Sequence, residues 1–310
     1  MIKTVTVINY LGERLDLELA APEKSGLFVQ SITGIGPGKA SINVTNMASN
    51  DGGIVNSTRA ETRNIVMKIG MYEHFVEDSS WTIEKARLKT YKYFPKKREL
   101  TLAFKTDGRY VYTKGYVESN EPDIFSSKFE ACQISIICPD PNFYEASGET
   151  YIRLARIVDL LEFPYSNESL TENLTEFGSI FTDLSQVILT YTGEIETGIN
   201  IKVRCSGPVT GFKLYNFETG EKIEISDSKL TQVVPDGLSD GDEIRICTIR
   251  GKKSAKLIRE GNSYNILNSL GLHPSWFQIY QGDNIFSYDA TSGSSNVKIE
   301  MTYENAYEGV

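Results

Sequence analysis

The sequence has 310 residues, of which 40% are hydrophobic and 24% are charged, and its formal net charge is −9 at pH 7. This composition excludes a disordered chain, and the length predicts two globular domains of ~150 residues, each able to bury its own core. The acidic balance disfavours broad contact with nucleic-acid phosphates, and no run approaches the ~20 apolar residues of a membrane span. We therefore expect neither stable nucleic-acid binding nor a membrane span.

The start of the chain and its cysteines indicate a reducing compartment. The first ten residues alternate like a strand and lack the apolar core of a signal peptide, so we expect synthesis in the cytoplasm. Cys132 and Cys138 fall on one predicted strand, ~20 Å apart and beyond disulfide reach. With Cys205 and Cys247 they are expected to be reduced, small apolar residues.

Alternation and turn chemistry predict strands at residues 27–35, 40–44 and 65–69, with a turn at Asn50-Asp51-Gly52-Gly53. The segment Gly34-Ile35-Gly36-Pro37-Gly38 lacks the third glycine of a dinucleotide-binding loop. The next residues alternate as a strand, so no helix N-terminus is present to hold an anion. We interpret this segment as a loop between strands.

One helix is predicted from about Ser80 to Tyr93. Asp78, Ser79 and Ser80 are candidate N-caps, and Pro95 ends the helix. Helical spacing puts Trp81, Leu88 and Tyr91 on a common face. The following Lys96-Lys97-Arg98 is interpreted as a solvated turn, with a contact to a neighbouring subunit as the less favoured alternative.

A hairpin and a long strand follow the helix. Residues 100–104 and 109–117 are predicted to pair across the turn Asp107-Gly108. The next predicted strand, from Phe129 to Cys138, places every second residue from Cys132 onward on one face. Pro139-Asp140-Pro141 ends it.

These segments, in this order, resemble the ring-forming N-terminal domain of siphophage distal tail proteins. The resemblance rests on Trp81-x-Ile83-x-x-Ala86-Arg87, the hairpin, Gly115-Tyr116-Val117-Glu118, Asp123-Ile124-Phe125 and the run from Ile134 to Tyr144, in which Cys138-Pro139-Asp140-Pro141 is the most specific part. It implies that residues 1–150 form a split β-barrel-like domain with one principal helix.

The second half, residues 151–310, has strand-like runs separated by turns every eight to twelve residues, which is typical of a β-sandwich. The predicted strands are 187–191, 199–205, 212–217, 222–225, 243–249, 276–280 and 297–302. Their order resembles the galectin-like C-terminal domain of the same family. The expected fold is therefore mainly β, in two domains.

The sequence offers no catalytic, cofactor or metal site. Its two histidines, His74 and His273, form no zinc motif and lie near no nucleophile in the sequence. The pairs Glu194 with Glu196 and Asp240 with Asp242 have a spacing that glycoside hydrolysis could use, but both flank glycine turns. Trp276 is expected in the core. We expect no enzyme and no cofactor.

The resemblance implies a structural component of a bacteriophage tail tip, or of a phage-derived device, located in the virion. Six copies would form a homohexameric ring that joins the tail tube to the baseplate hub, with a lumen for genome passage. Its partners would be itself, the tail tube protein, and the tail-associated hub and tape-measure proteins. In the alternative, the galectin-like domain attaches host carbohydrate or a receptor-binding protein; a tail-associated hydrolase is a third hypothesis.

Overall fold

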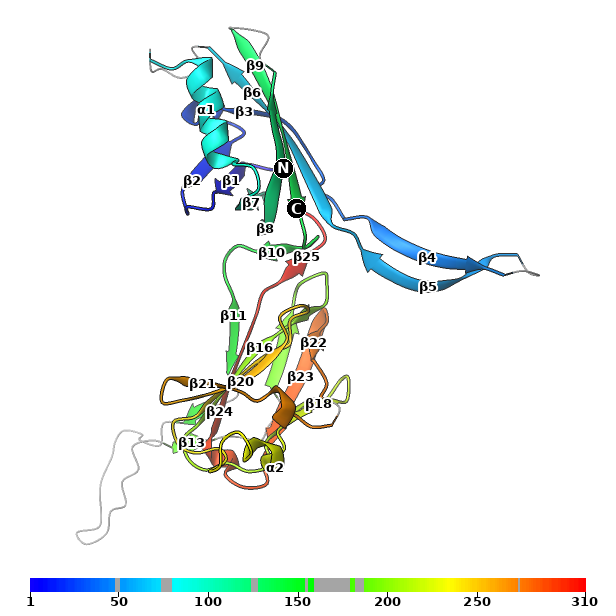
Figure 1. Ribbon diagram of the computed structural model, residues 1–310, viewed down its shortest axis with the longest axis vertical. Helices are drawn as coiled ribbons and strands as arrows, with labels where there is room; N and C mark the ends of the chain where they lie inside the picture. The colour runs from blue at the N-terminus through cyan, green and yellow to red at the C-terminus, as the bar shows by residue number, and fades with distance from the viewer. Residues whose placement is uncertain are drawn as a thin grey trace, which may run out of the picture. The chain divides into compact units, whose positions relative to one another are not determined.

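The structure is a computed structural model that describes residues 1–47, 51–73, 80–123, 128–153, 156–158, 179–181, 187–272 and 274–310. The chain divides into two compact units (Figure 1): unit 1 comprises Met1–Gly148 and Ala306–Val310, and unit 2 comprises Glu149–Asn305. Residues 306–310 were assigned to the second domain from the sequence, but they pack with unit 1. The reason is a strand pairing between β25 (Ala306–Tyr307) and β10 (Phe143–Glu145).

Unit 1 is built on one large antiparallel sheet with the strand order β2-β1-β7-β8-β9-β6-β3, to which β10 and β25 are added beside β8. Its strands are β1 (Thr4–Ile8), β2 (Arg14–Glu18), β3 (Phe28–Thr33), β6 (Arg63–Tyr72), β7 (Glu99–Lys105), β8 (Tyr110–Pro122) and β9 (Phe129–Cys138); a short 3-10 helix, η1 (Pro22–Lys24), precedes β3. Strand β9 has the bounds that the alternation predicted. Its inward residues, Cys132, Ile134, Ile136 and Cys138, are fully buried, because period-two alternation sends them all into one core.

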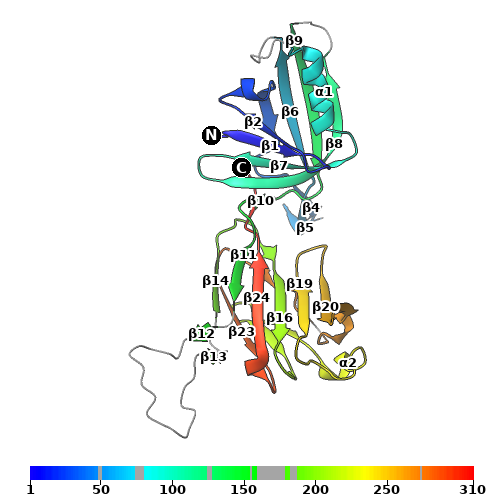
Figure 2. The ribbon, with the colours of Figure 1, turned by 90° about the vertical axis from the view of Figure 1, so that its left-hand side faces the viewer.

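Helix α1 (Ile83–Tyr93) packs against β6, β8 and β9 (Figure 2). It begins three residues later than predicted, because the side chain of Thr82 accepts a hydrogen bond from the Lys85 N–H and is the N-cap. The residues that helical spacing grouped on one face do not form the buried face of the helix. Leu88 and Tyr91 are exposed, and the buried face consists of Ile83, Ala86 and Thr90.

Unit 2 consists of two main antiparallel sheets around a separate hydrophobic core. The six-stranded sheet has the order β11-β24-β16-β19-β20-β21, and the four-stranded sheet has the order β14-β23-β17-β18. The strands are β11 (Thr150–Arg153), β14 (Val187–Tyr191), β16 (Asn200–Cys205), β17 (Lys213–Asn216), β18 (Glu221–Glu224), β19 (Glu243–Cys247), β20 (Ser254–Arg259), β21 (Asn262–Asn265), β23 (Gly282–Asp289) and β24 (Val297–Tyr303).

Smaller elements complete unit 2. They are the pairs β12 (Arg156–Val158) with β13 (Ser179–Phe181) and β15 (Thr197–Gly198) with β22 (Gln278–Ile279), the helix α2 (Asp227–Leu230), and the 3-10 helices η2 (Leu267–Ser269) and η3 (Ser294–Asn296). The strand predicted at 276–280 is thus only two residues long. The prediction of a mainly β protein with one principal helix is confirmed, since α2 has only four residues.

Candidate assembly interface

A two-stranded arm, β4 (Ala40–Asn46) paired with β5 (Gly53–Ala60), leaves the main sheet of unit 1 and forms a sheet of its own. Figure 1 shows the two strands running away from the other strands of that unit. All eight residues of β5 are exposed. An isolated two-stranded hairpin is only marginally stable in water, so an arm of this kind is expected to be stabilised by a surface on which it packs.

The arm carries exposed aliphatic side chains. Val44 and Val55 are direct cross-strand partners, so their side chains share a face of the ribbon. They are 47% and 56% exposed, and Ile42, two residues before Val44, is 58% exposed. On a narrow ribbon with solvent on both sides these side chains have no core to enter. A contiguous apolar surface of this kind is typical of a protein interface.

The glycine-rich segment 34–38 forms one side of the root of the arm, which is the place where the arm leaves the main sheet. Gly34 has a φ of +81°, and a Cβ at this position would collide with the carbonyl oxygen of Asn64. The carbonyl groups of Gly34 and Gly36 both accept hydrogen bonds from the Arg63 guanidinium. The interpretation of this segment as a loop between strands is confirmed.

Other exposed features of unit 1 lie on α1 and after it. Leu88 and Tyr91 on the outer face of α1 are 55% and 41% exposed. Lys96, Lys97 and Arg98 are exposed as well, and the Arg98 guanidinium lies 5.2 Å from the centre of the Tyr10 ring. These side chains extend the surface that a partner could contact, but unlike the arm they belong to elements that already pack on the core.

One carboxylate of each pair singled out in the sequence is engaged in an ion pair. Asp242 is fully buried, and both of its oxygens accept hydrogen bonds from Arg259, at 2.7 and 2.6 Å. Glu196 forms an ion pair with Arg250. Carboxylates neutralised in this way are poorly suited to act as a general acid or as a nucleophile. His74 and His273 lie outside the described residues, as do Asn50, Asp78, Ser79, Ile124 and Phe125.

The described residues contain no group of histidine, cysteine and carboxylate side chains that could hold a metal ion. Within the same ranges, neither helix has the length and apolar character needed to cross a bilayer. The four cysteines are free thiols. Trp276 is half-buried against the core of unit 2, with Lys253 Nζ 5.4 Å from its ring centre.

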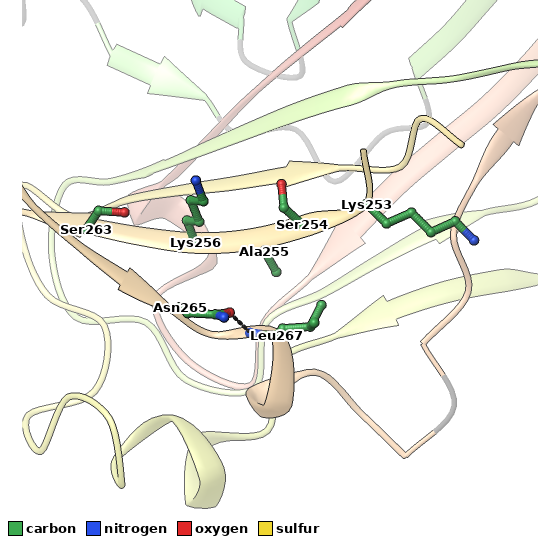
Figure 3. A pocket seen from close by; sticks show the side chains of 7 residues that line it. All are labelled: Lys253, Ser254, Ala255, Lys256, Ser263, Asn265 and Leu267. Carbon is green, nitrogen blue, oxygen red and sulfur yellow. Dashed lines mark hydrogen bonds between the residues drawn. The ribbon is translucent and has the colours of Figure 1, made fainter. Parts of the chain in front are cut away.

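One open hollow lies beside β20 and β21 in unit 2 (Figure 3). It is lined by Lys253, Ser254, Ala255, Lys256, Ser263, Asn265 and Leu267. The lining contains no aromatic ring on which a sugar could stack, and the Asn265 side chain is already used to accept the backbone N–H of Leu267. The hollow therefore lacks the aromatic-lined groove expected of a carbohydrate site.

The fold of the chain is similar to that of two solved phage proteins. The chain is similar to the SPP1 Dit (gp 19.1) protein, described as a paradigm of the hub adsorption apparatus in Gram-positive infecting phages, with a TM-score of 0.64 and 12% identity over 97% of this chain and 98% of that one. It is also similar to a chain of the phage P2 baseplate in its activated conformation with Ca, with a TM-score of 0.50 and 12% identity over 100% of both chains. No curated protein matches the sequence.

A second comparison matches part of the chain to a family. Residues 192–307 match the family model described as siphovirus-type tail component, C-terminal domain. Most of unit 2 therefore matches the C-terminal domain of this family of phage tail components. The resemblance to siphophage distal tail proteins predicted from the sequence is confirmed, by the family match in unit 2 and by the shared fold elsewhere.

Proposed function

We propose that the chain is the distal tail protein of a siphovirus-type tail, and that six copies close into a ring at the tail tip. The observation that carries this proposal is the exposed arm of unit 1, with Val44 and Val55 on one face. Packing each arm on the next copy would bury its aliphatic face. A contact between two different surfaces of identical chains, repeated around an axis, closes a cyclic ring.

The large sheet of unit 1 supports the same proposal. Its order ends at β2 on one side and β3 on the other, so two strands present unpaired backbone groups at the edges. Natural proteins cover or disrupt such edges, and a neighbouring subunit is one way to cover them. In the proposed ring, arms and edges of successive copies together form the subunit contact.

The ring would join the tail tube protein on one side to the tail-associated hub and tape-measure proteins on the other, at the tip of the virion. Its lumen would let the genome pass. The net charge of −9 fits this role, because an acidic wall does not retain phosphates. The role is structural, without catalysis or a cofactor; release of cell-wall fragments by the purified protein would contradict that statement.

The test is the oligomeric state in solution and by negative-stain imaging. The wild-type chain is expected as a six-membered annulus, with a mass six times that of the monomer. Val44→Lys puts a charge on the aliphatic face and is expected to shift the protein to monomers. Asn43→Lys, the matched control, changes the adjacent residue, whose side chain points to the other face. A monomeric wild type at high concentration, or an intact annulus in Val44→Lys, would reject the ring.

A second candidate function, attachment of an anionic partner on unit 2, is favoured by a row of cations. Lys202, Arg245 and Lys256 are direct cross-strand neighbours on β16, β19 and β20. The alternate residues of these strands, such as Ile201 and Ile244, enter the core, so the row faces outward. Glu243 forms an ion pair with Arg245, and Glu300 is the other cross-strand neighbour of Lys202, so carboxylates partly balance the row. Like charges directly opposite each other are destabilising, and a bound anion would relieve the repulsion that is left.

In this alternative the partner is an acidic receptor-binding protein or an acidic host carbohydrate. A glycan array that includes acidic glycans would detect the carbohydrate. Fluorescence anisotropy with a labelled polyglutamate peptide would report binding to carboxylates, which is expected to weaken with salt. Lys202→Glu should abolish binding, whereas Lys222→Glu on the other sheet should not. Equal binding by both variants would remove the row as the site.

A further inference from the structure

The root of the arm is held by one buried guanidinium. Arg63 begins β6, directly after the arm, and is only 5% exposed. Its Nη1 donates to the carbonyl oxygens of Gly34, at 2.7 Å, and Gly36. Its Nε donates to the Pro141 carbonyl oxygen at 2.6 Å. Arg63 therefore joins the segments that enter and leave the arm to the loop that follows β9.

A segment that is distant in the sequence, residues 308–310, also contacts the Arg63 guanidinium and the loop beside it. Arg63 Nη2 donates to the carbonyl oxygen of Glu308 at 2.7 Å. Two residues later, the Val310 N–H donates to the carbonyl oxygen of Ile35 at 3.1 Å. Gly309 lies so close to Gly36 that a Cβ at position 309 would come within 3.4 Å of its backbone. Residues 308–310 thus lie directly on the root of the arm.

This segment is anchored on its other side as well. Tyr307 pairs with Phe143 through β25 and β10, and the Arg109 guanidinium lies 4.7 Å from the centre of the Tyr307 ring. Arg109 also donates to the Gly309 carbonyl oxygen at 3.3 Å. The segment is therefore fixed to the core of unit 1 by two arginines and a strand pairing. Because it also contacts the root of the arm, it restricts the movement of the arm relative to that core.

A fixed root matters for any arm that must dock. A flexible arm loses conformational freedom when it binds, and this loss opposes association, whereas an arm that is already oriented avoids it. The planar fork of arginine can hold several carbonyl groups at fixed angles, and a lysine ammonium, a point charge on a flexible stem, cannot. The contacts of the Arg63 guanidinium are therefore suited to fixing the orientation of the arm relative to the sheet of unit 1.

We propose that residues 306–310, held by Arg63 and Arg109, form a latch that sets the direction of the arm and so controls ring closure. The inference rests on the proposed function. The latch follows unit 2 in the sequence, so the root of the arm is incomplete until residues 149–305 have been synthesised. A chain that lacks a finished unit 2 would then carry an undirected arm and would be excluded from the ring.

The experiment measures the arm and the ring separately. Spin labels at Ser57→Cys on the arm and Lys114→Cys on β8, in a Cys247→Ser background, report the distribution of their distances. Two variants loosen the latch: Arg63→Lys, and a chain that stops after Tyr307 and keeps the β25 pairing. Arg259→Lys is the matched control, because its guanidinium is held in unit 2 by Asp242 and the Gly237 carbonyl. Circular dichroism checks that each variant unfolds cooperatively.

We expect a narrow distribution in the wild type and in Arg259→Lys, a distribution at least about twice as broad in both latch variants, and a fall of the annulus fraction only in those two. Unchanged widths in both latch variants would overturn the latch. Broader widths with an undiminished annulus would overturn its control of ring closure. If the wild type forms no annulus, the proposed function fails, and the widths alone still decide whether the latch directs the arm.

Discussion

The carboxylate of Glu130 on β9 lies 3.1 Å from Nε of Arg87 on α1, and its side chain is almost completely buried. This ion pair joins α1 to the start of β9. Burial raises the pKa of the Glu130 carboxyl, and the nearby Arg87 only partly opposes that effect. The folded protein therefore holds a proton at Glu130 more tightly than the unfolded chain does.

We expect the stability of unit 1 to depend on this group at mildly acidic pH. Because the folded pKa is raised, the stabilisation is present below the ordinary glutamate pKa of ~4.3 and is lost as the pH rises through the folded pKa. Glu130→Gln cannot titrate, so its free energy of unfolding should lack this decrease. Urea denaturation at a series of pH values measures the free energy of unfolding as a function of pH, with Glu118→Gln, at an exposed position, as the control. The same pH profile in Glu130→Gln and wild type would contradict this expectation.

The thiols give a second prediction. Burial raises the pKa of Cys132 and Cys138 to about 11 and that of Cys205 to about 12, so at pH 8 all three remain protonated. Thiolates, not thiols, react with alkylating reagents. We expect the native protein to react at Cys247 alone, and all four thiols to react in denaturant. Mass spectrometry after iodoacetamide treatment counts the modified sites, and rapid native labelling of Cys132 would show that the core of unit 1 opens.

Sequence reasoning succeeded where burial imposes a period on the chain. The bounds of β9 and β14 agree with the predicted strands, because each has inward side chains that fill a core. The arm is different. The sequence predicted the first part of β4 and the turn after it, but not β5, whose residues 56–59 are Asn, Ser, Thr and Arg. A strand exposed on all sides bears no alternation, so only the turn residues could have indicated it.

The latch could not be predicted from local sequence. Arg63 and Glu308 are 245 positions apart, and the contact uses a backbone carbonyl, which leaves no mark on the side chain at position 308. The buried face of α1 could not be predicted from the sequence for a related reason. Helical spacing correctly groups residues, but which group turns inward is decided by β6, β8 and β9, on which the helix packs.

A third prediction concerns the start of α1. Thr82 accepts a hydrogen bond from the Lys85 N–H, whereas the sequence favoured an earlier cap. Removing an N-cap oxygen leaves a helix N–H without its partner and costs about 1 kcal/mol. Thr82→Ala should lower the free energy of unfolding of unit 1 by that amount, and Ser80→Ala should change it by less than ~0.5 kcal/mol. Equal losses in the two variants would move the cap away from Thr82.

The last prediction uses the paired carboxylates at positions 240 and 242, which differ in burial although they are two residues apart. Asp240 is exposed, whereas Asp242 is buried and accepts from both Arg259 and the Ser239 N–H, at 2.8 Å for the latter. Removing one partner of a buried ion pair leaves an uncompensated charge and costs about 3–5 kcal/mol.

Asp242→Asn should therefore lower the free energy of unfolding of unit 2 by about 3 kcal/mol, since the amide keeps the shape but not the charge facing Arg259. Asp240→Asn, with the same chemical change on the surface, should stay within ~0.5 kcal/mol of the wild type. Urea titrations followed by tryptophan fluorescence measure both, because Trp276 packs on the core of unit 2. If the two variants had equal stability, the ion pair between Asp242 and Arg259 would contribute nothing to unit 2, and a different contact would have to hold the 236–242 turn on β20.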